Sequence, residues 1–151
     1  MSNKKRKDYP RRELSHDSHP TDKWIQNIFL GWFDPCPLNY DYNPISHTDG
    51  LKIDWRFHTF VNPPYSDPLP WVRKAIREQA KGNTVVLLLK HDSSTKWYSL
   101  LHEAGANFMM INGRLKYGNT KTAAFPSMLA VLTGHEPNPI LKGVTEFGEC
   151  E

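Results

Sequence analysis

An uninterrupted apolar run from Thr84 to Leu89 limits the folds that this chain can adopt. The run is the length of a strand, and it is far shorter than the roughly 20 residues that a membrane-spanning helix needs. Because both of its faces are apolar, other parts of the chain must cover both, as they do for a parallel strand of an α/β protein. The sequence therefore predicts a fully buried strand at the centre of the fold.

The segments around this run alternate between helical and strand patterns. Pro68 to Lys81 has apolar residues three and four apart, a proline near its start and Gly82 after its end, which is typical of a helix. The other predicted elements are a helix that begins at Thr21 or Asp22, a helix capped by Ser93 or Ser94 that runs through Glu103, and short strands at 32–34, 58–62, 108–111 and 128–132. This alternation predicts an α/β fold with a mostly parallel sheet flanked by helices.

The length of 151 residues suits one domain. We expect residues 1–18 to form a disordered basic arm, because this segment carries many lysines and arginines and hardly an apolar residue. Residues 19–135 are expected to form the domain and residues 136–151 a C-terminal tail. The basic arm is interpreted either as a phosphate-contacting tail or as a solvated terminus.

Charge and cysteine content bear on partners and compartment. The net charge of +3 and the pI of about 8.8 permit a nucleic-acid partner without establishing one. Cys36 and Cys150, the only two cysteines, match no zinc spacing, which indicates free thiols in a reducing compartment. No segment resembles a signal peptide or a membrane span, so we expect a cytoplasmic protein, monomeric or weakly dimeric, with no membrane partner.

The segment Asn62-Pro63-Pro64-Tyr65 indicates a particular chemistry. The amino nitrogen of adenine is a poor nucleophile because its lone pair is delocalised into the ring. The Asn62 side-chain oxygen and a backbone carbonyl next to it could accept both amino hydrogens and return the lone pair to nitrogen. The two prolines stiffen the turn, and an aromatic residue after them can stack on a base. The alternative interpretation is a diproline turn that only connects a strand to a helix.

The chain resembles a known family through several blocks in order. They are Phe33-Asp34-Pro35-Cys36, Asp49-Gly50-Leu51 with Trp55, Val61 to Ser66, Trp71-Val72 with Lys74-Ala75, Thr84 to Leu89, Gly113 to Tyr117, and Phe125 to Met128. This set resembles the phage-type DNA N-6-adenine methyltransferase (Dam-like) family. The resemblance implies a compact, minimal Rossmann-like methyltransferase that flips the target adenine out of DNA. It also implies that the methyl group passes in line from S-adenosylmethionine with no metal, and that the enzyme would be in the host cytoplasm if phage-encoded.

The resemblance also implies roles for individual residues. The catalytic set is Asn62, Pro63, Pro64 and Tyr65, with Asn62 and the Pro63 carbonyl on the amino hydrogens. The expected cofactor-binding set is Thr21, Trp24, Asp34, Pro35, Cys36, Asp49, Leu51 and Asn62. The expected DNA-binding residues in the resembling blocks are Arg114, Lys116 and Ser127. Lys90 and His91 are added because they follow the predicted strand at 84–89, at the same edge of the sheet as Asn62. Simpler interpretations are open for several of these residues, because Asp34 and Asp49 also suit turns and Trp24 suits a core.

This sequence departs from the family pattern in three places. Asp22 follows Thr21 where the resembling segment has proline, and Pro37 replaces a small residue after Cys36. No glycine-rich loop follows the predicted strand at 32–34. The missing glycines leave open a non-catalytic remnant of the fold that binds nucleic acid or sequesters cofactor. A related alternative is a methyltransferase acting on the cytosine amino group, although such enzymes more often have serine where Asn62 stands.

Overall fold

The computed structural model describes residues 21–37, 49–117 and 121–134. The predicted basic arm, the C-terminal tail and most of the loop expected between Cys36 and Gly50 lie outside the described residues. Within them, helices and strands alternate as far as residue 110 and only strands follow, and this mixture confirms the α/β class.

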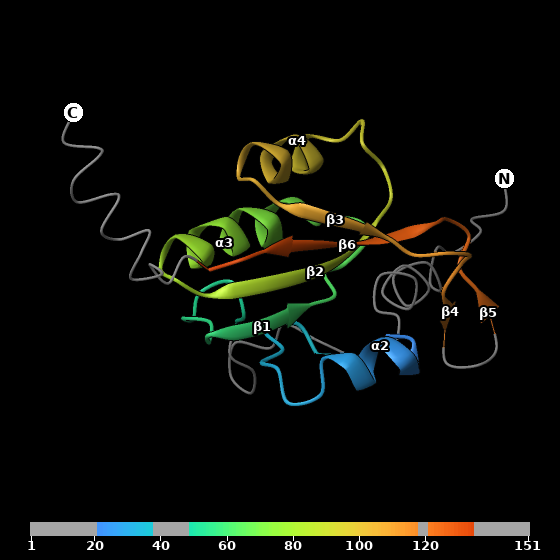
Figure 1. The fold of residues 1–151 in the computed structure, drawn as a ribbon, viewed down its shortest axis with the longest axis horizontal. Coiled ribbons are helices and arrows are strands. Elements are labelled where there is room, and N and C mark those ends of the chain that lie inside the picture. The colour runs from blue at the N-terminus through green and yellow to red at the C-terminus, as the bar shows by residue number, and fades with distance from the viewer. Residues whose placement is uncertain (1–20, 38–48, 118–120, 135–151) are drawn as a thin grey trace, which may run out of the picture.

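The main sheet has four strands in the order β1, β2, β6, β3 (Figure 1). Their bounds are His58–Val61 for β1, Thr84–Lys90 for β2, Asn107–Met110 for β3 and Ser127–Leu132 for β6. β1 pairs with β2 in parallel, with His58 opposite Thr84 and Val61 opposite Leu87. Phe33 adds a single parallel bridge to Thr59, where the sequence predicted a short strand.

The prediction of a mostly parallel sheet was wrong. β6 pairs antiparallel with β2 on one side and with β3 on the other, so two of the three strand pairings are antiparallel. β1, β2 and β3 nevertheless run in the same direction. β6 runs opposite to β2, and β3 runs opposite to β6, so β3 has the direction of β2. The departure therefore comes from one strand, which reaches the middle of the sheet from the end of the described chain.

The alternation of side chains along β2 divides the core into two halves. Val85, Leu87 and Leu89 belong to one buried cluster, and Val86 and Leu88 belong to the other. Figure 1 shows α3 and α4 over one face of the sheet and α2 on the other side. The first cluster packs against α3 (Leu69–Ala80) and α4 (Lys96–Glu103), and the second contains Ile25 of α2 (Lys23–Ile28). The central strand is thus buried on both faces, as its sequence predicted.

The helix ends follow from local residues. α3 begins with Leu69-Pro70, because proline is tolerated in a first turn whose N–H groups have no partner within the helix. α4 is capped by Thr95, whose hydroxyl accepts a hydrogen bond from the Tyr98 N–H at 3.2 Å. Ser93 and Ser94 were predicted as caps, but Ser94 donates its hydroxyl to Asp92 instead. α4 therefore starts later than expected.

A small hairpin lies beside the main sheet. β4 (Lys116–Tyr117) and β5 (Lys121–Thr122) pair antiparallel, and residues 118–120 between them lie outside the described residues. The flanking Leu115 and Ala123 are buried in the same cluster as Ile25. The hairpin is therefore anchored on the α2 side of the sheet.

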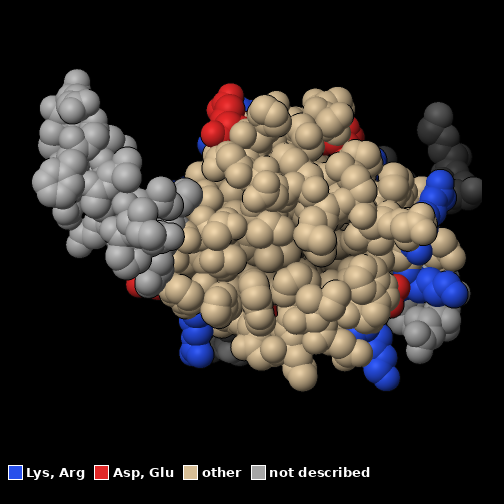
Figure 2. Space-filling model, in the orientation of Figure 1, with Lys and Arg blue, Asp and Glu red and all other residues tan. Residues whose placement is uncertain are grey.

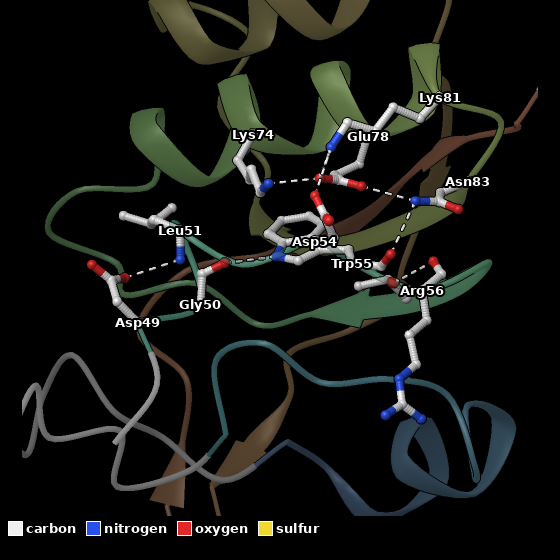
Figure 3. Close-up of polar contacts among 11 residues, drawn as sticks. Asp49, Gly50, Leu51, Asp54, Trp55, Arg56, Lys74, Glu78, Lys81 and Asn83 are labelled. Carbon is white, nitrogen blue, oxygen red and sulfur yellow. Dashed lines mark hydrogen bonds and ion pairs between the residues drawn. The ribbon is translucent and has the colours of Figure 1, made fainter. Parts of the chain in front are cut away.

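A polar cluster around one buried carboxylate lies at the amino ends of β1 and β2 (Figure 3). We call it the Glu78 cluster: Lys74, Glu78, Lys81 and Asn83. The buried Glu78 carboxylate accepts from Lys74 at 2.6 Å, from Lys81 at 3.0 Å and from Asn83 at 2.8 Å. Burial alone would raise the pKa of Glu78, but these hydrogen bonds outweigh it and hold the pKa below its ordinary value.

Candidate active site

The Asn-Pro-Pro-Tyr segment forms the turn that leaves the carboxyl end of β1. The strand ends at Val61, because neither Pro63 nor Pro64 has an N–H to donate to the ladder. Asn62 is half-buried at this point, and its side-chain nitrogen donates to the Thr21 hydroxyl at 3.1 Å. This bond joins the turn to a residue 41 positions earlier and brings together two residues that the resemblance placed at one site.

A pocket of about 170 Å³ lies beside the turn. It is lined by Pro63, Pro64, Tyr65, Pro68, Leu89, Lys90, Asp92, Thr95 and Trp97. A cavity of about 150 Å³ can hold benzene, so this pocket has room for a group the size of an aromatic ring, and not for a whole nucleotide. Asn62 is not among the lining residues; the pocket begins at the residue that follows it.

Tyr65 and Lys90 both contact the aromatic ring of Phe125. The Tyr65 and Phe125 rings pack edge to face, with their centroids 4.8 Å apart. The Lys90 ammonium lies 5.6 Å from the centre of the Phe125 ring, within the range of a cation–π contact. Phe125 therefore connects the turn after β1 to the end of β2, two places that are far apart in sequence.

The two blocks with predicted cofactor-binding acids are in direct contact. A side-chain carbon added at Gly50 would lie only 2.0 Å from the Pro35 carbonyl oxygen, so only glycine permits this approach. Asp34 accepts from the Cys36 N–H at 2.9 Å, and Asp49 accepts from the Leu51 N–H at 3.0 Å. Each aspartate thus orders its own turn, which is the simpler role that the sequence left open for both.

The environment of the first block affects two ionisable groups. Desolvation raises the pKa of the Asp34 carboxyl, although the hydrogen bond from the Cys36 N–H opposes the rise. Burial, with a smaller contribution from the charge of Asp34, raises the pKa of the Cys36 thiol to about 12. Cys36 is therefore a neutral thiol at physiological pH, and it packs in the core as a small apolar residue.

The remaining predicted cofactor residues differ in exposure. Trp24 on α2 is 45% exposed, so it is a surface residue and not the core residue of the simpler interpretation. Leu51 is half-buried and packs against the α3–α4 side of the core. Pro35 is buried, where its carbonyl meets Gly50.

The predicted DNA-binding residues lie on two parts of the surface. Lys90 and His91 are exposed at the end of β2, and the His91 N–H donates to the Pro126 carbonyl at 2.9 Å. Arg114 and Lys116 are exposed on either side of the buried Leu115; Lys116 is the first residue of β4, and Arg114 lies just before the hairpin. Basic side chains gather at the end of the molecule that carries β4 and β5, while the centre of the face in view is mostly uncharged (Figure 2).

Ser127 does not fit the predicted DNA-binding role as the structure stands. It is 2% exposed at the start of β6, opposite Lys90, and its hydroxyl has no hydrogen-bond partner among the described residues. Its side chain would reach DNA only if the neighbouring chain moved. Its backbone carbonyl accepts from the Ile111 N–H at 3.2 Å.

Several residues near the turn were not singled out by sequence reasoning. Asp92 and Thr95 from the loop before α4, and Trp97 from the first turn of α4, line the pocket together with Pro64. Asp92 accepts hydrogen bonds from Ser94, which lower its pKa. One signal in the sequence could have found Asp92: it directly follows Lys90 and His91, which were predicted at this edge of the sheet.

Two negative findings apply to the described residues. They contain no group of three or more histidine, cysteine or carboxylate side chains placed to hold a metal ion. No helix among them is both long enough and apolar enough to span a membrane.

The fold and the site together define an α/β protein with an Asn-Pro-Pro-Tyr turn at the carboxyl edge of its sheet. Residues 42–130 match the family described as DNA N-6-adenine-methyltransferase (Dam), which is more than half of the chain. The chain belongs to this DNA N-6-adenine-methyltransferase family, which confirms the resemblance drawn from the sequence blocks. No solved structure was found to match the chain.

Two curated relatives carry the same description. A DNA N-6-adenine-methyltransferase of Haemophilus phage HP1 is 36% identical over 101 residues, covering 61% of this chain and 58% of the relative. A DNA N-6-adenine-methyltransferase of Escherichia phage T1 is 36% identical over 70 residues, covering 45% of this chain and 29% of the relative. The chain thus spans little more than half of the first relative and less than a third of the second.

Proposed function

We propose that the chain transfers a methyl group from S-adenosylmethionine to the exocyclic amino group of adenine in DNA. The observation that carries the proposal is the Asn62 carboxamide at the end of β1, held by Thr21 and followed directly by the residues of a ring-sized pocket. Membership of the family supports the substrate, since both relatives are named for the adenine amino group of DNA.

Asn62 and the Pro63 carbonyl would act on the nucleophile. The Asn62 side chain donates an N–H to the Thr21 hydroxyl. Its carboxamide oxygen would therefore be the atom that accepts a hydrogen bond from the adenine amino group. The Pro63 carbonyl would accept the other hydrogen. With both hydrogens bound, the nitrogen lone pair is directed at the methyl group, and the fixed turn keeps this geometry with little reorganisation.

The pocket beside the turn suits a base taken out of the duplex. It admits a ring-sized group between the diproline and Trp97, and Tyr65 forms part of its wall. A flipped adenine stacked on Tyr65 would enter this pocket and leave its sugar and phosphates outside, where Lys90 is exposed. The edge contact with Phe125 would hold the Tyr65 ring at a fixed angle for stacking.

The cofactor would lie on the Thr21 side of Asn62. Asp34 follows Phe33, the residue that extends the sheet beside β1, and could pair with the amino group of the methionine moiety. The close approach of Gly50 to Pro35 places Asp49 and Leu51 next to the same block. S-adenosylmethionine supplies the electrophilic methyl group when bound, while the residues of this chain bind and orient it.

A labelling assay tests the proposed function. The purified full chain is incubated with S-adenosylmethionine labelled in its methyl group and with unmethylated DNA, and the DNA is digested to nucleosides. Label in N6-methyladenine is the expected result. Label in N4-methylcytosine would replace adenine with cytosine as the substrate, and cofactor binding without labelled DNA would indicate a non-catalytic remnant.

A further inference from the structure

Two consecutive residues join three distant parts of the molecule. The Thr21 hydroxyl accepts from Asn62 at 3.1 Å, and the Asp22 carboxylate accepts from the backbone N–H of Lys116 at 3.1 Å. The second bond links residues 94 positions apart in sequence. Through these two hydrogen bonds, Thr21 and Asp22 at the start of α2 connect the turn after β1 to the β4–β5 hairpin.

Asp22 is not used as an aspartate at the start of a helix usually is. It occupies the N-cap position of α2, where an aspartate side chain normally accepts from an N–H of the first turn. Its side chain makes no such bond, and its backbone carbonyl accepts from Ile25 and Gln26 instead. The carboxylate is committed to the hairpin and not to its own helix.

Among the described residues, the hairpin contacts the α2 segment through apolar packing and through the hydrogen bond from the Lys116 N–H to Asp22. Leu115 and Ala123 share a buried cluster with Ile25, and the Ala123 N–H donates to the Leu115 carbonyl at 2.7 Å. Apolar packing is non-directional, so it keeps the hairpin close without fixing its angle. A charge-assisted hydrogen bond is directional, so the exposed bond that the Lys116 N–H donates to Asp22 favours one orientation of β4 relative to α2.

We propose that Asp22 is a positioning residue that couples the basic hairpin to Asn62. DNA bound by Arg114 and Lys116 would displace the hairpin, and this displacement would be transmitted to Asn62 through the hydrogen bonds of Asp22 and Thr21. The proposal rests on the proposed function, because it assigns DNA contact to the hairpin and base contact to Asn62. The coupling itself can nevertheless be measured without any methyl transfer.

The experiment follows two signals by NMR in the full chain as duplex DNA is added. They are the backbone amide of Lys116 and the side-chain amide of Asn62, the latter assigned by its loss in Asn62→Ser. In the wild type we expect DNA to shift both signals. In Asp22→Ala we expect faster hydrogen exchange at the Lys116 amide and no response of the Asn62 side chain to DNA. Asp22→Asn should keep the response, because an amide oxygen can accept the same bond.

Activity gives the second measurement and separates coupling from simple anchoring. At saturating DNA and cofactor, Asp22→Ala should lower kcat about tenfold, as expected for a lost hydrogen bond to a charged group, and Asp22→Asn should restore most of it. Asp54→Ala is the control, since it removes the same charge from an exposed ion pair with Lys81. An unchanged kcat with a raised KM for DNA, or an Asn62 response that persists in Asp22→Ala, would overturn the coupling. A wild type that shows the NMR response but transfers no methyl group would overturn the proposed function and leave the coupling in place.

Discussion

The two ends of the main sheet hold polar side chains in opposite ways. At the amino ends of β1 and β2, the Glu78 cluster surrounds a fully buried carboxylate with three donors. At the carboxyl ends, Asn62 is only half-buried, and exposed Lys90 and half-buried Asp92 stand at a pocket. The first arrangement surrounds its carboxylate with donors from the protein, whereas the second leaves its polar groups partly exposed beside a pocket. The buried Glu78 carboxylate, whose pKa is lowered, is thus a structural feature. The candidate site lies at the carboxyl ends of β1 and β2, where the polar groups are less buried.

The sharpest test of this contrast makes the same change at both ends. Asn62→Ala should lower methyl transfer by about a hundredfold to a thousandfold, since it removes a preorganised group from the reacting nitrogen. Cofactor binding and the thermal midpoint should stay close to those of the wild type. Asn83→Ala should lower the thermal midpoint and leave methyl transfer close to that of the wild type, because Asn83 donates to Glu78 and to the Trp55 carbonyl. Similar activity in the two variants would remove the distinction between the ends.

The next largest effect is expected on stability. Glu78→Ala leaves the Lys74 ammonium buried without its 2.6 Å partner, which should cost about 3 kcal/mol in the free energy of unfolding measured with urea. The folded protein that remains should keep its kcat. Loss of activity without loss of stability would place the Glu78 cluster in the catalytic machinery instead.

The same cluster predicts a dependence of stability on pH. The pKa of Glu78 is lower in the folded protein than in the unfolded chain, so its contribution is fully present above the unfolded pKa of about 4.3. The contribution is lost as the pH falls through the lower pKa of the folded state. Unfolding measured from pH 6 to pH 3 should therefore show a steeper loss in the wild type than in Glu78→Gln.

A smaller effect, on the KM for DNA, should distinguish Tyr65, which lines the pocket, from Tyr98, which does not. Tyr65→Ala should raise the KM for DNA about tenfold, as expected for one lost stacking contact with a base, and Tyr65→Phe should change it little. Tyr98, which stacks on Phe108 away from the pocket, supplies the control. If Tyr98→Ala raised the KM as much as Tyr65→Ala, stacking of a base on Tyr65 would lose its support.

The smallest effect is expected from the segment outside the described residues. Removal of residues 1–18 should weaken DNA binding at moderate salt and reduce the dependence of affinity on salt concentration, because phosphate contacts release counterions. Binding isotherms at several salt concentrations measure both quantities. An unchanged slope would return the basic arm to the interpretation of a solvated terminus.

Local patterns predicted most of the fold. The apolar run of β2, the spacing of α3 and the prolines after Val61 each act within a few residues, so the sequence alone was enough for them. The direction of β6 was not predictable in this way, because an apolar strand reads the same whether its neighbours are parallel or antiparallel. The cap of α4 was misplaced because Ser93, Ser94 and Thr95 can all cap a helix, and the competing bond from Ser94 to Asp92 decided between them.

The site was predicted less completely than the fold, for the same reason. The Asn-Pro-Pro-Tyr turn is contiguous, so its residues were found together, and their roles stay a prediction. The bonds from Asn62 to Thr21 and from Lys116 to Asp22 join residues far apart in sequence, and no local pattern announces them. Ser127 was predicted to bind DNA, yet its place at the start of β6 buries its side chain.

The position of β6 has a consequence for how the protein is made. β6 lies between β2 and β3, and within the described residues it is the only strand with which β3 pairs. While the chain is being synthesised, the sheet stays divided until residues 127–132 have left the ribosome, and these contacts span long stretches of sequence, which slows folding. A product that stopped before Ser127 would therefore lack the strand that joins the two parts, and it would not be a shorter working version of the protein.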